Sequence, residues 1–429
     1  MFERFGFIVT ACERAVVAKK RILLLISFLE PWSMGPERGA PSLYETIRGY
    51  ASAGWHVHYL TAQKRSVGGG SHEQNIDIKI PDVSVQRFPL PAPFTKLGLR
   101  VQGKLDRLYY FPSYAAKAIQ EYLERVNPTL IYAYEEGAIL AMSRLKSNFI
   151  CCPVLHRFQG TILGSSYRSF PAIMRKMETW MALRKQADLY VMTDDGTLGD
   201  QALTYWNSHV SEDNLLFIRN GIDSTVKGET DDHTSKLERF SEPGDAPILL
   251  MVSRLAGWKR IDRGIDLVSD LLGRYSSTKL IVVGDGEQKD QLMSYAVAKG
   301  VKDNVFFAGS QPRSTVFSLM QSCDIFLSLY DISNCGNPLF EALLSGIPVI
   351  TLNNGSTSAV VTDRINGLLV EPNDQFGLFS AMLELYENES LRRKISEGGL
   401  AWARQNMLSW DDRMEVELNW IYSQVQLRG

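Results

Sequence analysis

The stretch Asp331–Val349, DISNCGNPLFEALLSGIPV, decides how we interpret the rest of the chain. It follows the short apolar run 324–330, which is typical of a buried strand. Asn337 suits the N-cap of a helix, and Pro338 suits the first helical position, where no backbone donor is needed. Gly346 can end that helix in the left-handed conformation. The stretch therefore predicts a strand, a glycine loop and a helix that begins at the carboxyl end of the strand.

Such an arrangement points to a ligand site. In a parallel α/β sheet, ligands bind at the carboxyl ends of the strands, and the free N–H groups of a helix N-terminus favour phosphate. Glu341 lies one turn into the helix, and its carboxylate suits sugar hydroxyls better than it suits a phosphate. The alternative is an ordinary capped helix in which Glu341 only complements the helix dipole. This stretch alone leaves both interpretations open.

Length and composition limit the class of protein. A chain of 429 residues is too long for one ordinary core and indicates two or three domains. The composition is 45% apolar and 22% charged, without a long apolar span, as in globular proteins. A net charge of −2 gives no reason to expect nucleic acid as a partner.

The distribution of charge and cysteine says more than the totals. Residues 1–215 hold 25 Lys and Arg against 20 Asp and Glu, whereas the remainder holds 21 against 28. A mildly basic first half favours an anionic surface or acceptor. The five cysteines are odd in number and lack the spacing of metal sites, which favours a reducing compartment. Residues 1–20 lack the apolar core of a secretory signal, so we expect a cytoplasmic protein.

The first half has the pattern of a Rossmann-like domain. A strand at 20–27, a Gly/Pro loop at 31–41, a helix at 42–53 and a strand at 55–60 form a βαβ unit. The loop contains Gly39, and loops at this place expose backbone donors. Its sequence is not the dinucleotide fingerprint, so we expect no dinucleotide cofactor. Later strands end at Glu135 and Glu136 and at Gln159, and we expect these polar ends to face the cleft of an open sheet.

The segment 88–115 mixes basic and apolar side chains. Lys96, Arg100, Lys104 and Arg107 alternate with aromatic and aliphatic residues. Such a pattern is found where a protein touches a membrane surface or a lipid-linked acceptor. It also fits a loop that leads into an ordinary amphipathic helix, and the sequence does not decide between the two.

The second half begins a new α/β series. A strand ends at Asn220-Gly221, and a polar tract to residue 245 has the character of a linker. The run 247–252 is the next strand, and Arg254 and Lys259 follow it closely. Both can reach the phosphate site at the helix that begins near Asn337. A diphosphate bound there would be held by two hydrogen bonds from the guanidinium and by the compact positive charge of the ammonium.

Six motifs in order, over roughly residues 215–375, resemble family 4 of the retaining GT-B glycosyltransferases. They are NGID at 220–223, SRL-x-x-x-K at 253–259, VVGDGE at 282–287, V-x-F-x-G at 305–309, GNPLFEAL-x-SGIPVI at 336–350 and INGLLVEP at 365–372. The first half resembles the family by topology and by the strand end Arg157–Thr161, RFQGT.

The resemblance implies an α/β protein of GT-B fold, with two Rossmann-like domains that face a cleft. The N-terminal acceptor-side domain would be residues 1–215, completed by about 405–429, and residues 216–404 would bind the nucleotide sugar. A final helix at 408–427, with an apolar stripe of Trp410, Met414, Leu418 and Ile421, would cross back to the first domain.

The resemblance also implies roles for single residues. Arg254 and Lys259 would stabilise the leaving diphosphate, and Glu341 would bind the nucleotide ribose. Gln159 stands where the family has the histidine of a His-Gly pair, and we place it among the catalytic residues. The remaining donor-binding positions would be Gly336, Asn337, Leu339, Asn334, Ser333, Gly309 and Gly39. The family usually has a glutamate at the position of Ser333, and Asp331 or Asn334 are candidates to replace it.

The sequence therefore predicts a glycosyltransferase that moves a sugar from a UDP- or GDP-sugar to a sugar or lipid-linked acceptor hydroxyl, with retention of configuration. We expect no cofactor and no metal, since Asp285-Gly286-Glu287 after a strand is more simply a turn than a metal site. Peripheral contact with the inner face of a membrane is compatible with the basic first half. Two rival interpretations are a nucleotide-sugar epimerase of the same fold and a non-catalytic subunit.

Overall fold

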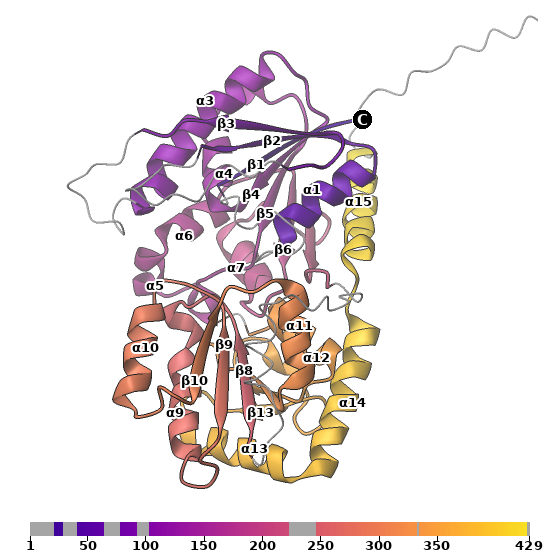
Figure 1. Cartoon of the computed structure of the whole chain (residues 1–429). Helices are drawn as coiled ribbons and strands as arrows, with labels where there is room; N and C mark the ends of the chain where they lie inside the picture. Colours follow the sequence, from indigo (N-terminus) through magenta and orange to yellow (C-terminus); the bar gives the residue numbers. More distant parts are fainter. Residues whose placement is uncertain are drawn as a thin grey trace, which may run out of the picture.

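The protein consists of two α/β halves, each built on a parallel sheet with helices on its faces (Figure 1). The computed structural model describes residues 21–28, 41–63, 78–91, 103–222, 246–332 and 334–426. The predicted architecture of two parallel-sheet domains is confirmed.

The first sheet has seven parallel strands in the order β3-β2-β1-β4-β5-β6-β7. The strands are β1 Ile22–Ser27, β2 His56–Ala62, β3 Val83–Phe88, β4 Leu130–Tyr134, β5 Val154–Phe158, β6 Leu189–Thr193 and β7 Leu215–Ile218. The helices are α1 Ser42–Ser52, the π-helical turn η2 Asp106–Tyr110, α3 Phe111–Leu123, α4 Glu135–Met142, α5 Phe170–Arg175, α6 Met177–Leu183 and α7 Gly199–Trp206. The chain first builds outward from β1 through β2 to β3, then returns to the other side of β1 with β4.

The second sheet has six strands in the order β10-β9-β8-β11-β12-β13. They are β8 Ile248–Val252, β9 Lys279–Val283, β10 Val305–Gly309, β11 Ile325–Ser328, β12 Val349–Leu352 and β13 Leu368–Val370. The helical segments are η5 Gly257–Lys259, α9 Ile261–Leu271, α10 Lys289–Ala298, α11 Arg313–Ser322, α12 Asn337–Ser345, α13 Gln375–Glu387, α14 Glu389–Asn406 and α15 Trp410–Gln426. Here the direction of growth reverses between β8 and β11.

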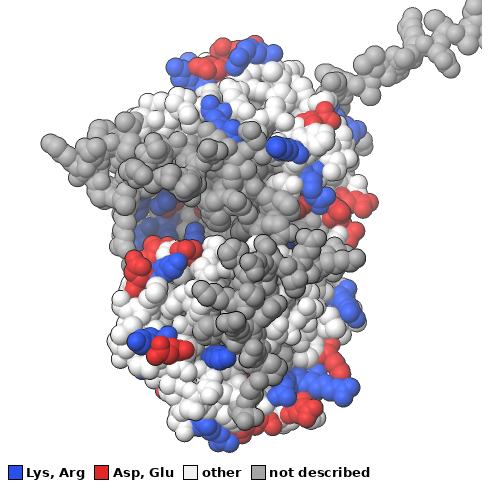
Figure 2. Space-filling view, viewed as in Figure 1, with Lys and Arg blue, Asp and Glu red and all other residues white. Residues whose placement is uncertain are grey.

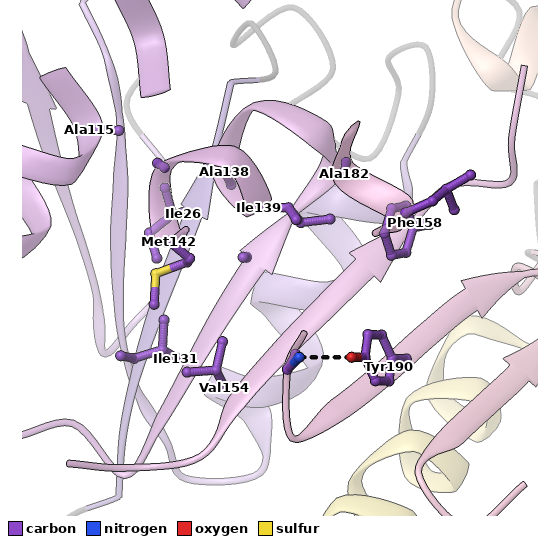
Figure 3. Close-up of a cluster of buried hydrophobic side chains, with 14 of the residues drawn as sticks. Ile26, Ala115, Ile131, Ala138, Ile139, Met142, Val154, Phe158, Ala182 and Tyr190 are labelled. Atoms are coloured by element: carbon purple, nitrogen blue, oxygen red, sulfur yellow. Dashed lines mark hydrogen bonds between the residues drawn. The ribbon is translucent and has the colours of Figure 1, made fainter. Parts of the chain in front are cut away.

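The central strands are buried on both faces, which explains why they appear in the sequence as continuous apolar runs. Figure 3 shows one such layer, in which Ala138, Ile139 and Met142 of α4 lie over Ile131 of β4 and Val154 of β5. This packing fixes α4, and hence the residue at its first position, relative to the carboxyl ends of β4 and β5.

The stretch 331–349 folds largely as predicted, with one correction. The strand is β11, the helix is α12, and Gly346 ends the helix at φ +78°. However, Gly336 rather than Asn337 is the N-cap, and Asn337 is the first helical residue. The Asn337 side chain is not free to cap, because its Oδ1 accepts a hydrogen bond from Asn220 Nδ2 at 3.4 Å.

The C-terminal helix crosses back to the first half, as predicted (Figure 1). The four residues of its apolar stripe are 0% to 7% exposed, and the stripe packs on α1 and the first sheet. Its approach is close: a Cβ atom placed on Gly49 of α1 would lie 2.6 Å from Cγ of Met414.

A buried ion pair completes the attachment of α15. Arg413 Nη1 lies 2.6 Å from Glu417 Oε2, and both side chains are 0% exposed. Glu417 Oε1 also accepts hydrogen bonds from the hydroxyls of Tyr132 at 2.9 Å and Tyr50 at 3.3 Å. Because an unpaired buried charge is costly, these partners define a single register for α15 on the sheet.

The predicted domain boundary at 215/216 stays a prediction. Strand β7 extends the first sheet to Ile218, and residues 223–245 lie outside the described part of the chain. Within the described ranges, no helix has the length and apolar character required to span a bilayer.

The contact between α1 and α15 can be tested because one substitution should change stability in opposite directions in an isolated helix and in the docked structure. Gly49→Ala in an isolated helix would stabilise by about 1 kcal/mol. In the docked structure the new methyl group meets Met414, so we expect a net destabilisation of about 1–3 kcal/mol. Thermal unfolding of Gly49→Ala, of Met414→Ala and of the double variant measures this, and the double variant should lose less than the sum of the two. A raised melting temperature for Gly49→Ala would show that α15 does not pack here.

Candidate functional site

Each sheet has one place where the strand order reverses. In open α/β sheets, ligands bind outside the carboxyl ends of the strands at this place. It lies between β1 and β4 in the first sheet and between β8 and β11 in the second. Figure 2 shows a recess between the two halves, on the left of the view, where basic and acidic side chains gather.

The loop after β8 brings Arg254 and Lys259 to this edge of the second sheet. Lys259 Nζ lies 3.7 Å from the ring centroid of Tyr330 and 4.2 Å from that of Trp258, positions that favour a cation. Burial lowers the pKa of Lys259 to about 7; Asp195 of the first half counteracts this shift, and Arg254 adds to it. The structure therefore brings the two predicted cations together and places an acidic residue of the first half near them.

The glycines of VVGDGE allow the loops after β8 and β9 to touch. A Cβ atom on Gly284, at φ +130°, would lie 1.8 Å from the carbonyl oxygen of Ser253. Gly284 N–H donates to the Gly309 carbonyl at 2.8 Å, so Gly309 holds the neighbouring strand end. Asp285 accepts from the N–H of Gly286 and from Lys289, as expected of a turn. The described residues contain no group of three metal-ligating side chains.

The loop between β11 and α12 is held by Asn334, which is 2% exposed. Its Oδ1 accepts from Tyr330 N–H at 3.0 Å, and its Nδ2 donates to the Tyr330 carbonyl at 2.7 Å and to Asn354 Oδ1 at 2.6 Å. Asp331 Oδ1 lies 2.9 Å from Arg263 Nη1. Both candidates to replace the missing glutamate thus have partners within the protein, and their contact with a donor stays a prediction.

The first turn of α12 presents backbone rather than side chains. Leu339 is 1% exposed and packs in the core, so only its backbone can face a ligand there, beside Gly336. Glu341 Oε1 lies 2.9 Å from Nη2 of Arg313, the first residue of α11. A charge-assisted pair of this kind orients the carboxylate. No pattern in the sequence indicated a role for Arg313.

Gln159 lies at the corresponding edge of the first sheet. Its Nε2 donates to the Tyr134 hydroxyl, and its Oε1 accepts from Asn220 Nδ2 at 3.4 Å. Asn220 thus stands between Gln159 of the first half and Asn337 of α12. The sequence marked Asn220 as part of a turn and of the NGID motif, but did not indicate that it contacts residues of both halves.

Two acidic residues of the first half also reach the recess. A Cβ atom on Gly160, at φ +86°, would lie 2.3 Å from Asp195 Oδ1, so this carboxylate sits directly against the backbone after β5. No pattern in the sequence singled out Asp195. Glu135 occupies the first position of α4 with φ +68°, and it interacts electrostatically with Arg254 of the second half. Its place at a strand end was predicted, but its backbone conformation was not.

The two halves also meet through backbone. Ser356 N–H donates to the Gly196 carbonyl at 3.4 Å, and a Cβ atom on Gly355 would lie 2.4 Å from that same oxygen. Gly196 and Gly355 have φ values of +85° and +58°. Only residues without a side chain allow this approach.

Gly39 and Ser333 lie outside the described residues. The roles predicted for both stay predictions.

The fold is that of a GT-B protein, and solved structures agree. Sucrose-phosphate synthase from Thermosynechococcus elongatus aligns with 96% of this chain and 100% of its own at a TM-score of 0.76 and 19% identity. HepE from Anabaena, solved in complex with UDP-glucose, aligns with 93% of this chain and 99% of its own at a TM-score of 0.67 and 19% identity.

Residues 232–402 match the model of the family glycosyl transferases group 1. The lipopolysaccharide core biosynthesis glycosyltransferase LpsE from Rhizobium meliloti is 30% identical over 161 residues, which are 38% of this chain and 46% of the relative. The matched region thus spans about half the length of such curated relatives. The resemblance inferred from the motifs is confirmed at the level of this family.

The low pKa of Lys259 predicts a pH dependence of nucleotide binding. Lysine is a cation below its pKa, so we expect UDP to bind with constant affinity below about pH 7 and more weakly above it. Asp195→Asn removes the negative charge that raises the pKa of Lys259. UDP affinity should therefore begin to fall at a lower pH in this variant. Isothermal titration calorimetry between pH 6 and 9 measures this, with Lys289→Ala as the control. An identical pH profile in Lys259→Ala would contradict the assignment.

Proposed function

We propose that the protein is a retaining glycosyltransferase that transfers a sugar from a nucleoside diphosphate sugar to an acceptor hydroxyl. The observation that carries this proposal is the convergence of Arg254 and Lys259 at the place where the second sheet reverses, next to the loop that leads into α12. Two cations and a helix N-terminus together provide positive charge for a diphosphate.

The chemistry of such a site is electrostatic. As the bond between the sugar and the diphosphate breaks, negative charge grows on the leaving group, and preorganised cations and N–H donors stabilise it. Arg254 and Lys259 would take the part that a metal ion plays elsewhere, so the proposed reaction needs no metal. Glu341, oriented by Arg313, would accept hydrogen bonds from the ribose hydroxyls.

The names of similar proteins support the choice of substrates. HepE has been solved with UDP-glucose, and LpsE is a glycosyltransferase of lipopolysaccharide core biosynthesis. We therefore propose a UDP- or GDP-sugar as donor and a sugar or lipid-linked acceptor in polysaccharide, glycolipid or glycoconjugate biosynthesis in the cytoplasm. Family 4 and retention of configuration belong to the same proposal.

Two substitutions test the two ends of the donor site. Lys259→Ala should lower kcat by roughly 10²–10³-fold, because its charge matters most as the leaving group becomes negative. Glu341→Gln should mainly raise the donor KM, because ribose contacts exist in ground and transition states alike. The measurement is release of UDP or GDP from the sugar nucleotide, with and without EDTA and with and without acceptor.

The controls for this test are Lys289→Ala, an exposed lysine of the same half, and Glu384→Gln, a carboxylate paired with Arg364 on the surface. An unchanged donor KM in Glu341→Gln would refute the ribose assignment. Rates abolished by EDTA and restored by Mn²⁺ would refute the metal-independent mechanism. Release that never depends on acceptor would favour an epimerase or a non-catalytic protein.

We further propose that the helical segment 103–110, which includes the turn η2, meets a membrane surface or a lipid-linked acceptor. Lys104 and Arg107 are exposed here, and Tyr109 is 59% exposed beneath the guanidinium of Arg144. Basic and aromatic side chains together suit an anionic lipid interface.

Reversal of these charges tests the membrane proposal. The double variant Lys104→Glu and Arg107→Glu should lose sedimentation with anionic phosphatidylglycerol vesicles, while UDP affinity stays as in the wild type. The control variant is Lys117→Glu with Arg125→Glu, which reverses one exposed charge within α3 and one just after its C-terminus. It should have little effect on sedimentation. Equal sedimentation of both double variants would return this segment to a purely structural role.

A further inference from the structure

Glu135 lies where the strand order of the first sheet reverses. Strand β4 ends at Tyr134, which is in register with Ser27 of β1 and Arg157 of β5. Glu135 is the next residue, so it stands just beyond the carboxyl end of β1, level with the last residue of β5, and begins α4. Arg254 and Lys259 lie at the corresponding reversal of the second sheet, where they follow β8, the counterpart of β1.

The backbone of Glu135 is strained. Its φ of +68° belongs to the left-handed region, which a residue with a side chain enters at a cost. Glycine would take this conformation without strain. Strained residues of this kind concentrate at functional sites, where the surrounding structure imposes the conformation.

The carboxyl group of Glu135 has charged neighbours but no fixed partner within the described residues. Its neighbour Glu136 accepts a hydrogen bond from Thr179 Oγ1 at 2.9 Å, whereas none joins the Glu135 carboxyl to another described residue. Burial and the nearby charge of Glu136 raise the pKa of Glu135 to about 8, while Arg157 and Arg254 act in the opposite direction. Tyr59 and Tyr134 are the other titratable groups that sense it.

We propose that the Glu135 carboxyl binds the hydroxyl group of the acceptor, opposite the diphosphate held by Arg254 and Lys259. The inference rests on the proposed function and names the residue that would receive the acceptor. At neutral pH the carboxyl is protonated, so it can donate one hydrogen bond and accept another, as an acceptor hydroxyl requires. Arg254 from the second half faces the same group, which places the acceptor beside the leaving diphosphate.

This assignment predicts a pH dependence with a defined sign. The protonated form exists below about pH 8, so the acceptor KM should be low there and rise at higher pH. Glu135→Gln resembles the neutral acid, and should keep a low KM without that rise. Glu135→Ala should raise the KM about three- to tenfold at pH 7, the effect of losing one hydrogen bond. Glu136→Gln removes a charge that favours the protonated form, and should move the rise to lower pH.

Glu135 should also lower the free energy of unfolding of the protein. A carboxyl whose pKa is raised in the folded state destabilises the protein progressively as pH rises from about 4.5 to about 8. The melting temperature of Glu135→Gln should therefore exceed that of the wild type by an amount that grows over this range. Glu135→Gly, which also relieves the backbone strain, should be more stable still and yet lose acceptor binding. A residue with a purely structural role would not show this combination.

The kinetic experiment uses the full-length protein with UDP-glucose and GDP-mannose as donors. Methyl and octyl glycosides of glucose, galactose, mannose and N-acetylglucosamine serve as acceptor probes, and the best of them is carried through the variants. If none is used, hydrolysis of the donor is measured instead, with water in place of the acceptor hydroxyl. In that case Glu135→Gln should keep the wild-type rate below pH 8, and Glu135→Ala should lower it.

Three results would overturn the proposal. They are wild-type kinetics in Glu135→Ala, equal losses in Glu135→Gln and Glu135→Ala, and an acceptor KM that falls as pH rises. If neither UDP nor GDP raises the melting temperature of the wild type, the proposed function itself fails and this inference falls with it. If the Glu135 variants still bind nucleotide, a failed prediction for Glu135 counts against this inference alone and not against the proposed function.

Discussion

The position of α15 on the first sheet is the constraint on which the rest of the structure depends. The Arg413–Glu417 pair lies between Tyr50 and Tyr132 and away from water, where either charge alone would be strongly unfavourable. The described part of the first half ends near Gly221, whose lack of a side chain lets the backbone of Trp410 approach. Two connections at one side therefore orient the halves, so that the reversal points of both sheets face one recess.

The recess combines charges that neither half would hold at low cost by itself. Lys259 is buried against two aromatic rings, and its ammonium is supported by Asp195 from the other half. Glu135 is supported in turn by Arg254. Each half thus places a charged side chain beside an ionisable group of the other half. Such a site is stable only with both halves in place, and a bound anion or hydroxyl would satisfy groups that have few partners without it.

The fold was predictable because its signals are local. Continuous apolar strands, glycine ends and the spacing of Trp410, Met414, Leu418 and Ile421 each arise within one element. The positions of Arg254 and Lys259 at the edge of the second sheet were predictable because both residues follow a strand closely. Asp195, Arg313 and the bridging position of Asn220 were not, since each acquires its importance from a residue far away in the chain. The N-cap of α12 was assigned to the wrong residue for the same reason: a distant side chain engages Asn337.

The contact between Gly196 and Gly355 has a consequence for motion. Two main chains touch there through one long hydrogen bond, and the side chain of Cys335 lies close to Gly196. Such a contact limits how closely the two halves can approach each other. Its single hydrogen bond contributes little to the free energy that holds them together. A motion that closes the recess would end where these two main chains meet, so the contact would set the spacing of the two reversal points. The closest approach of the halves would then depend on Gly355, because even the methyl group of an alanine there would collide with the Gly196 carbonyl oxygen.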